Sequence, residues 1–362
     1  MNPYRLLFIL PTRRPPANPR RIVLILPCCI GDVVMATATL KALRSAYPRA
    51  QITWAVGSWS RKAIEDHDLL DDVLDTGPDA LPVRSREEII QFAALLRAGN
   101  YDLAVSLVRS PLMSLAVLMS GIPYRAGLDS AGRGFGYNLR ARINPQVARH
   151  EGEIYLDVAR ALNIDTNGCY ANVPVRPAYA SKLRGLVGSK GAYLVINPAG
   201  GSNPGMTLDA KRWPPGNFAA LADRLTEDLQ ARVILIAGPK DQPIVDAVTE
   251  AMTHSVYDYS GKFSFGEIAA LAAGAVVYIG NDTGLTHLAA AAGAKTVMIL
   301  GPTDPVRYAP FTPDSLALWK AVSLPDGGVA AGAPADWDWS RDGISVEEAY
   351  SAIRQFLSQS PP

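Results

Sequence analysis

The first half of the chain alternates short apolar runs with longer segments whose apolar residues recur at helical spacing. The run 22–26 contains no alternating polar residue, which predicts a buried strand of a parallel sheet. The next segment, from Asp32 to Tyr47, has an apolar face at helical spacing, and Pro48 ends it. The same patterns predict strands at 51–56, 69–74, 103–108 and 124–127, and helices at 85–98 and 111–119. This order predicts a parallel sheet covered by helices on both faces.

The second half repeats this organisation. An apolar strand at 193–197 runs into a glycine-rich turn at 198–205. Further strands are predicted at 232–237, 275–280 and 296–300, and helices at 214–229, 242–252, 265–272 and 283–292. The spacing of Ser345 and Glu348 predicts a capping box for a last helix that ends near residue 357. Two doubly wound α/β domains are expected, with ligands in a cleft at the carboxyl ends of their strands.

The length of 362 residues fits two domains of ordinary size. Residues 172–177 carry two prolines and suit an interdomain linker, whereas 323–342 is rich in Gly, Ala, Pro and Asp and is expected to be a loop. The predicted regions are a basic N-terminal extension (1–21), a first Rossmann-like domain (22–175), a second Rossmann-like domain (176–322), and a loop with the C-terminal helix (323–362).

Composition and charge exclude several classes of protein. The chain is 48% hydrophobic and 19% charged, which is typical of a folded globular protein. Its net charge of +1 argues against binding to nucleic acid. A local basic cluster (Arg13, Arg14, Arg20 and Arg21) is either a solvated tail or a contact for anionic lipid head groups. The apolar stretch 6–11 is too short for a signal segment, and no run approaches the roughly 20 residues that span a bilayer, so any membrane contact is expected to be peripheral.

The three cysteines include an adjacent pair, Cys28 and Cys29, and no CxxC motif. This arrangement predicts neither an ordinary disulfide framework nor a zinc site. A reducing compartment, and therefore a cytoplasmic location, is expected.

The first candidate chemical motif follows the strand at 22–26. Gly31 is expected to allow a tight turn, and Asp32 stands where a helix begins, so that exposed amide groups stabilise its carboxylate. Two interpretations stay open for Asp32: an N-cap residue, or a general base that takes a proton from a sugar hydroxyl. A dinucleotide cradle is not predicted, because the loop has one glycine instead of G-x-G-x-x-G.

The second motif follows the strand at 193–197. Gly201, Ser202 and Asn203 offer backbone and side-chain donors that suit a phosphate group. Lys211 and Arg212 stand just before a predicted helix, where the helix dipole disfavours positive charge unless an anion compensates it. We interpret the basic pair as a diphosphate site, with a solvated basic pair as the alternative.

The third motif surrounds the start of the helix predicted at 283–292. Asp282 and Thr283 are expected to cap this helix, and Gly284 permits close approach of a ligand. His287 lies one turn further on the same face and is either a core residue or a phosphate ligand. Asp241, at the end of another strand, accepts hydrogen bonds from a ribose or caps the following helix.

Together with a Gly-Pro-Thr-Asp-Pro turn at 301–305, these segments resemble the ADP-heptose:lipopolysaccharide heptosyltransferases, glycosyltransferase family 9. The resemblance runs from about residue 22 to residue 311, with the motifs in the same order. It implies a GT-B fold, in which an N-terminal Rossmann-like domain binds the acceptor and a C-terminal one binds the nucleotide-sugar. It also implies an inverting glycosyltransferase of cell-envelope polysaccharide biosynthesis that uses no metal or other cofactor.

The resemblance further implies a role for each site residue. The donor is a nucleotide-sugar such as ADP-heptose, and the acceptor is a glycan or glycolipid met at the inner face of the plasma membrane. Asp32 is the general base, Lys211 neutralises donor phosphate, and Asp241 is the approximate match for the ribose ligand. The residues that hold the diphosphate are Asp282, Thr283, Gly284 and His287.

Two segments depart from the family pattern. The loop 27–30 carries the two cysteines, and the loop 202–210 is longer than in the lipopolysaccharide enzymes, which leaves the donor sugar open. Two alternative functions also remain: a non-catalytic sugar- or nucleotide-sugar-binding protein, and an NAD-dependent sugar-nucleotide enzyme. The second needs a glycine-rich dinucleotide cradle that the first loop lacks.

Overall fold

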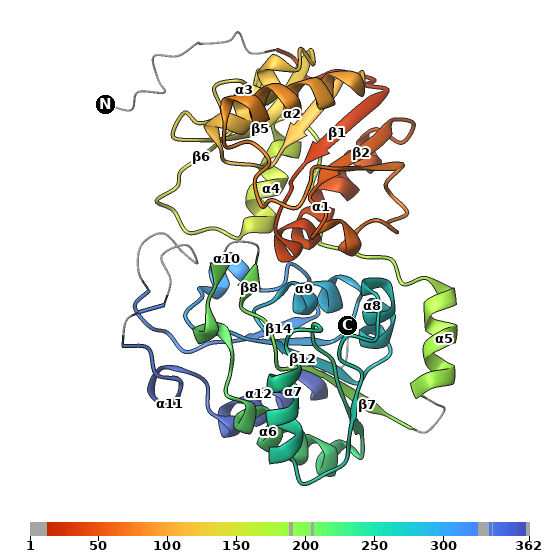
Figure 1. The fold of residues 1–362 in the computed structure, drawn as a ribbon, viewed down its shortest axis with the longest axis vertical. Coiled ribbons are helices and arrows are strands. Elements are labelled where there is room, and N and C mark those ends of the chain that lie inside the picture. The colour runs from red at the N-terminus through yellow and green to blue at the C-terminus, as the bar shows by residue number, and fades with distance from the viewer. Residues whose placement is uncertain (1–12, 188–190, 204–205, 325–332, 335, 360–362) are drawn as a thin grey trace. The chain divides into compact units, whose positions relative to one another are not determined.

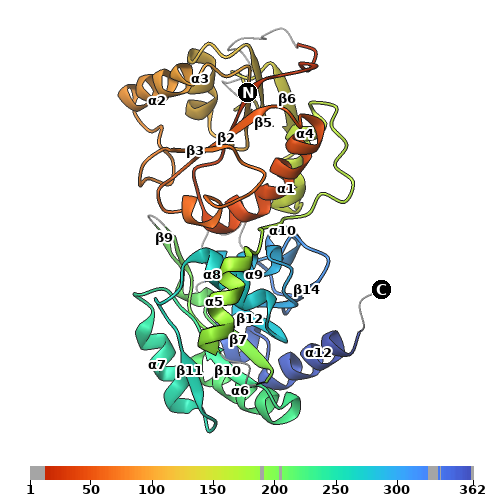
Figure 2. The same ribbon diagram turned by 90° about the vertical axis from the view of Figure 1, so that its right-hand side faces the viewer.

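The computed structural model describes residues 13–187, 191–203, 206–324, 333–334 and 336–359 (Figures 1 and 2). It divides into two units, one ending at Ala171 and the other beginning at Asn172. The predicted boundary lay slightly later, after residue 175. The apolar stretch 6–11 lies outside the described residues.

The first unit contains one six-stranded parallel sheet of order β3-β2-β1-β4-β5-β6. Its strands are β1 (Arg21–Ile25), β2 (Gln51–Val56), β3 (Asp72–Asp75), β4 (Leu103–Ser106), β5 (Tyr124–Ser130) and β6 (Leu139–Ile143). Its α-helices are α1 (Ile30–Ala46), α2 (Arg86–Ala98), α3 (Pro111–Met119) and α4 (Glu151–Arg160). The chain reverses its direction of strand addition between β1 and β4, and this switch point is where open α/β sheets bind ligands.

The second unit has the same strand order, β11-β10-β7-β12-β13-β14, and is again parallel. Its strands are β7 (Tyr193–Asn197), β10 (Arg232–Leu235), β11 (Val256–Asp258), β12 (Val277–Asn281), β13 (Thr296–Ile299) and β14 (Ser315–Leu318). Its α-helices are α5 (Pro177–Val187), α6 (Pro215–Leu229), α7 (Gln242–Ala251), α8 (Phe265–Ala273), α9 (Gly284–Ala291), α10 (Pro305–Tyr308), α11 (Trp339–Asp342) and α12 (Val346–Ser358). The switch point of this sheet lies between β7 and β12.

The central strands of both sheets are buried on their two faces, as the continuous apolar runs predicted. In β1, Val23 and Ile25 join a core with α2 and α3, whereas Ile22 and Leu24 point the other way and are equally inaccessible to solvent. Figure 2 shows α1 and α4 on that other side of the sheet, where the two helices pack against each other. The predicted α/β class of two doubly wound parallel sheets is confirmed.

Some local predictions were wrong. The turn predicted at 198–205 contains the start of a small antiparallel ribbon, β8 (Ser202–Asn203) with β9 (Met206–Thr207), which a short 3₁₀ helix, η3 (Asp209–Lys211), follows. The loop predicted at 323–342 ends in α11, in its described part.

The capping box before α12 is confirmed, because Ser345 N–H donates to Glu348 and Glu348 N–H donates to Ser345. The same arrangement begins α2, with Ser85 and Glu88, and α8, with Ser264 and Glu267.

The described part of the basic N-terminal extension lies against the first sheet. Arg13 N–H donates to the carbonyl of Asn138, and the Arg13 guanidinium lies 5.6 Å from the centre of the Tyr124 ring. The amides of Arg20 and Arg21 both donate to the carboxylate of Asp102. Among the described residues, no helix has the length and apolar character needed to cross a bilayer.

Candidate functional site

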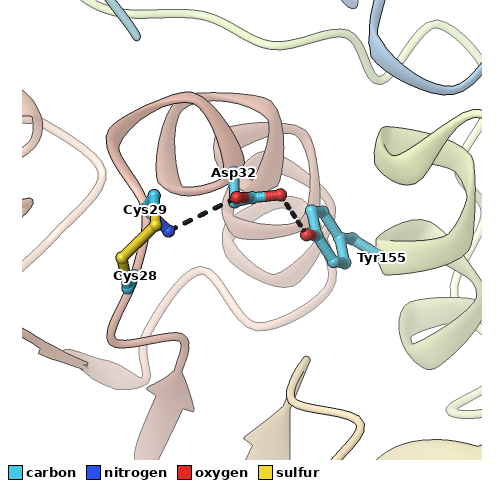
Figure 3. The surroundings of a disulfide bond; sticks show 4 residues. All are labelled: Cys28, Cys29, Asp32 and Tyr155. Carbon is cyan, nitrogen blue, oxygen red and sulfur yellow. Dashed lines mark hydrogen bonds between the residues drawn. A yellow bond between two sulfur atoms is a disulfide. The ribbon is translucent and has the colours of Figure 1, made fainter. Parts of the chain in front are cut away.

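Asp32 lies in the first turn of α1, at the switch point of the first sheet. The N-cap of this helix is Cys29, and its amide donates to Asp32 Oδ2 over 3.3 Å. The hydroxyl of Tyr155 donates to Asp32 Oδ1 over 2.7 Å (Figure 3). The N-cap interpretation of Asp32 is therefore wrong, because Asp32 is the third helical residue. Gly31 is also inside the helix, so the tight turn predicted there does not exist.

Tyr155 was not recognised from the sequence, because the polar segment 151–160 was not predicted as a helix. It belongs to α4, is buried, and stands one turn after Glu151, which is also buried. Glu151 forms an ion pair with Arg109, a residue of the loop after β4. Burial, reinforced by the negative charge of Asp32, raises the pKa of Tyr155 well above its ordinary value. The neighbourhood of Asp32 thus contains a protonated phenol and a paired carboxylate.

The adjacent cysteines Cys28 and Cys29 are joined to each other by a disulfide (Figure 3). The sequence pattern predicted no ordinary disulfide framework, and this bond is not one, because it links direct neighbours; the bond itself was not predicted. The third cysteine, Cys169, is buried and carries a free thiol. The disulfide lies directly before α1, so it precedes the helical turn that holds Asp32.

At the switch point of the second sheet, Lys211 and Asp282 form a buried ion pair. Lys211 Nζ lies 2.5 Å from Asp282 Oδ2, and His287 Nε2 lies 3.7 Å from Asp282 Oδ1. Burial alone raises the pKa of Asp282, but the charge of Lys211 and the neighbouring His287 imidazole outweigh it and hold that pKa well below its ordinary value. The sequence motifs at 211–212 and 282–287 therefore form one site.

Arg212 does not share this ion pair. Its Nε donates to the carbonyl of Gly200 over 2.7 Å, and its Nη1 pairs with Asp209 over 2.5 Å. The sequence predicted that the two cations before α6 need a bound anion for compensation. This part of the argument is wrong, because Asp282 compensates Lys211 and Asp209 compensates Arg212.

The loop after β7 meets the start of α9. Gly200 has a φ of +123°, and a Cβ built there would lie 2.0 Å from Thr283 Cγ2, so only glycine allows this approach. Thr283 stands at the N-cap position, yet its side chain makes no capping hydrogen bond, contrary to the prediction. Its hydroxyl instead accepts a weak bond from Asn197 Nδ2 at 3.4 Å. Gly284 is the first residue of α9.

Asn281, the last residue of β12, connects three segments around this site. Its Oδ1 accepts from the amide of Trp213 over 2.9 Å, and its Nδ2 donates to the carbonyls of Pro198 and Ala199. The side chain is fully buried. Sequence analysis gave it no role, although an asparagine at the end of a buried strand is a signal that its amide satisfies neighbouring backbone groups.

The remaining donor-site candidates lie on adjoining loops. Gly201 has a φ of +77°, and its carbonyl accepts from the amide of Leu208. Ser202 is exposed in β8, and only the backbone of Asn203 is described. Asp241 follows β10 at the N-cap of α7, but it makes no capping hydrogen bond, and burial raises its pKa. The capping interpretation of Asp241 is therefore not supported.

A family model described as glycosyltransferase family 9 (heptosyltransferase) matches residues 89–326, more than half of the chain. The chain belongs to glycosyltransferase family 9. It is therefore a glycosyltransferase, and this assignment replaces the non-catalytic and NAD-dependent alternatives.

Proteins with sequences similar to this family 9 chain are named as heptosyltransferases. The lipooligosaccharide heptosyltransferase 2 of Haemophilus influenzae is 25% identical over 323 residues, covering 83% of this chain and 88% of the relative. The lipopolysaccharide heptosyltransferase 3 of Escherichia coli K12 is 25% identical over 304 residues, covering 80% of this chain and 85% of the relative.

Solved structures show that the family 9 chain has the GT-B fold. A family 9 glycosyltransferase from Veillonella parvula aligns with a TM-score of 0.78 at 21% identity. The alignment covers 96% of this chain and 100% of the Veillonella chain. The E. coli ADP-heptose lipopolysaccharide heptosyltransferase II aligns with a TM-score of 0.72 at 22% identity, covering 93% and 98%. An E. coli heptosyltransferase solved with ADP aligns with a TM-score of 0.67 at 19% identity, covering 93% and 99%.

His287 Nδ1, in α9, and Thr303 Oγ1, in the loop after β13, are buried without a hydrogen-bond partner among the described residues. Unpaired buried polar atoms are costly, and a bound ligand is one explanation for their presence. Within the same part of the chain, no group of three His, Cys, Asp or Glu side chains is arranged to hold a metal ion.

Proposed function

We propose that this family 9 enzyme is an inverting glycosyltransferase that moves a sugar, heptose or a relative of it, from a nucleoside-diphosphate sugar to a hydroxyl of a glycan or glycolipid. The observation that carries the proposal is the buried group Lys211, Asp282 and His287 at the N-terminus of α9. The relatives named as lipopolysaccharide and lipooligosaccharide heptosyltransferases support the class of substrate.

In this proposal the donor diphosphate binds at the first turn of α9. The amides of Gly284 and Leu285, the first two residues of the helix, have no carbonyl partner among the described residues and favour an anion, whereas the Thr286 amide donates to Thr283. His287 Nδ1 supplies a buried, unpaired ring nitrogen, and Lys211 supplies positive charge. Gly201, Ser202 and Asn203 line the approach from the loop after β7, and Arg212 holds that loop through Gly200.

The proposed reaction is a direct displacement at the anomeric carbon. The acceptor oxygen forms a bond to that carbon while the bond to the diphosphate oxygen breaks, and the electron pair leaves with the nucleoside diphosphate. Asp32 receives the proton of the acceptor hydroxyl. Lys211 and the first turn of α9 stabilise the negative charge that develops on the leaving group, which is the contribution expected to be largest.

The variant Asp32→Asn tests the base. Asparagine retains an oxygen that accepts from the Cys29 amide, so the start of α1 is preserved. Loss of a general base is expected to lower kcat by about 10²- to 10⁴-fold while ADP affinity, measured by calorimetry, stays unchanged. The exposed Asp68→Asn is the matched control. Turnover of Asp32→Asn at the control's rate would contradict the assignment.

Asp241 is proposed to accept hydrogen bonds from the donor ribose. Its half-buried carboxylate makes no bond to α7, which leaves it available to a ligand. Asp241→Ala is expected to weaken ADP binding about tenfold and to leave inorganic pyrophosphate binding unchanged, because a hydrogen bond to a charged group contributes about 1.5–3 kcal/mol. Asp246→Ala, on the exposed side of α7, is the control. Equal loss of ADP and pyrophosphate affinity would count against a ribose contact.

A peripheral contact with the inner face of the plasma membrane completes the proposal. Arg13, Arg14, Arg20 and Arg21 all remain exposed, although Arg13 and Arg21 also lie over tyrosine rings. Each basic residue near an anionic surface adds about 1 kcal/mol to binding. Replacement of Arg13, Arg14 and Arg20 by glutamine is expected to reduce co-sedimentation with phosphatidylglycerol vesicles, with phosphatidylcholine vesicles as the control. Unchanged sedimentation would contradict this contact.

A further inference from the structure

The carboxylate of Asp32 is held by one hydrogen bond on each oxygen (Figure 3). The bond from the Cys29 amide is local, because it spans three residues at the start of α1. The bond from Tyr155 spans 123 residues and crosses from α4 to α1. The local bond orients Asp32 relative to its own helix, and the distant bond orients it relative to the rest of the unit.

We propose that Tyr155 is a positioning residue for the reaction: its hydroxyl fixes the rotation of the Asp32 carboxylate so that a free lone pair meets the acceptor hydroxyl. The inference rests on the proposed role of Asp32 as base. A carboxylate oxygen has two acceptor sites, so the bond from Tyr155 to Oδ1 leaves capacity for a proton. Asp32 is only partly buried and stays accessible to an acceptor.

Tyr155 acts as a donor and not as a second base. Its ring is buried, and Asp32 is the acceptor of its hydroxyl bond. Burial and the nearby carboxylates raise its pKa well above the ordinary value, so the hydroxyl keeps its proton throughout the working pH range. A neutral phenol that donates to a carboxylate fixes the orientation of that carboxylate without competing for the acceptor's proton.

Tyr155 is supported by an ion pair of its own helix and by helix packing. Glu151, one turn earlier in α4, is buried and bonded to Arg109 from the loop after β4. The helix itself packs along α1. This ion pair anchors the start of α4 at the switch point, and the anchored helix determines where the Tyr155 hydroxyl meets Asp32. A residue that acts through another side chain needs such support, because a misplacement of about 1 Å costs about 100-fold in rate.

The variant Tyr155→Phe removes only the hydroxyl. We expect kcat to fall about 10- to 100-fold, with the KM for the nucleotide-sugar and the affinity for ADP unchanged. Tyr137→Phe is the matched control, since Tyr137 is another fully buried tyrosine of the same unit, whose hydroxyl donates to Ser106. We expect this control to retain kcat. Near-ultraviolet circular dichroism verifies that both variants keep their packing.

A double-mutant cycle separates this inference from the proposed function. If Tyr155 acts through Asp32, then Tyr155→Phe causes no further loss of kcat in the Asp32→Asn background. An additive loss of kcat would overturn the inference, and so would a Tyr155→Phe enzyme whose kcat equals that of Tyr137→Phe. In either case, a large loss of kcat in Asp32→Asn would still support Asp32 as the general base. Wild-type turnover by Asp32→Asn would instead overturn the proposed function and the inference with it.

Discussion

Lys211 Nζ lies 2.5 Å from Asp282 Oδ2, and both side chains are almost fully buried. The ammonium group is therefore held at the switch point of the second sheet before any ligand arrives. A charge that is already positioned requires little reorganisation when negative charge develops on a leaving diphosphate. The same contact gives Lys211 a structural role beside its proposed chemical one, and the two roles are separable by experiment.

Removal of either partner of this ion pair is expected to destabilise the second unit. Lys211→Met leaves a buried carboxylate without its cation, and Asp282→Asn leaves a buried cation, so each is expected to lower the free energy of unfolding by about 3 kcal/mol. The double variant is expected to lose less than the sum of the two. Urea denaturation measures all three, and strict additivity would show that the pair is not coupled.

Acid is expected to weaken the fold through Asp282. Its folded pKa lies well below the unfolded value of about 3.9, so the ionised carboxylate stabilises the folded state above that value. This stabilisation is lost as the pH falls below about 4 toward the folded pKa. Thermal unfolding midpoints recorded from pH 6 to pH 3 are expected to fall more steeply for the wild type than for Asp282→Asn. Parallel curves would show that another carboxyl group carries the dependence.

Gly200→Ala is expected to disturb the start of α9. The added Cβ would collide with Thr283 Cγ2. The alanine backbone would also have to keep the positive φ of Gly200. Gly293→Ala is the matched control, because Gly293 has a φ of +83° with open space around it. Both variants are expected to lose about 1–2 kcal/mol of stability from backbone strain. Only Gly200→Ala should also lose ADP affinity, by tenfold or more in calorimetry. Equal ADP affinity in the two variants would exclude the proposed diphosphate site at Thr283.

The disulfide between Cys28 and Cys29 determines how many cysteines react with an alkylating reagent before and after reduction. In denaturant without reductant, one cysteine per chain, Cys169, is expected to react with an alkylating reagent, and all three should react after reduction. The variant Cys169→Ser is expected to give none before reduction and two after it. Mass spectrometry reads both numbers. Three reactive thiols before reduction would show that Cys28 and Cys29 are not joined. The expected reducing compartment stays a prediction.

The sequence was most informative about strands buried on both faces. The run beginning at Ile22 contains only apolar residues, and the run beginning at Tyr193 is apolar up to its last residue, Asn197, so the sequence predicted two strands buried on both faces. The edge strand β6 alternates arginine with apolar residues, and the opposite-edge strand β11 of the second sheet has only three residues. Neither carries the continuous apolar run on which the prediction relied, so both were missed.

The sequence predicted where the site residues lie along the strands, but not which side chains contact one another. Loops at the carboxyl ends of the central strands pointed to Asp32 and Asp282, because strand order determines where ligands bind. That Lys211 pairs with Asp282, and that Tyr155 reaches Asp32, depends on side-chain directions across separate helices. The pattern of apolar positions carries no information about such contacts.

In the part of the chain that the structure describes, four helices begin in the same way. At α2, α8 and α12 the third helical residue is a glutamate whose carboxylate accepts the N-cap amide, and at α1 this residue is Asp32. Under the proposed mechanism, an ordinary helix-start residue has been recruited as the base. Helix formation and catalysis then tolerate different substitutions at position 32, because asparagine preserves the first and removes the second. One codon change would therefore turn a family 9 transferase into a folded pseudoenzyme that still binds its nucleotide.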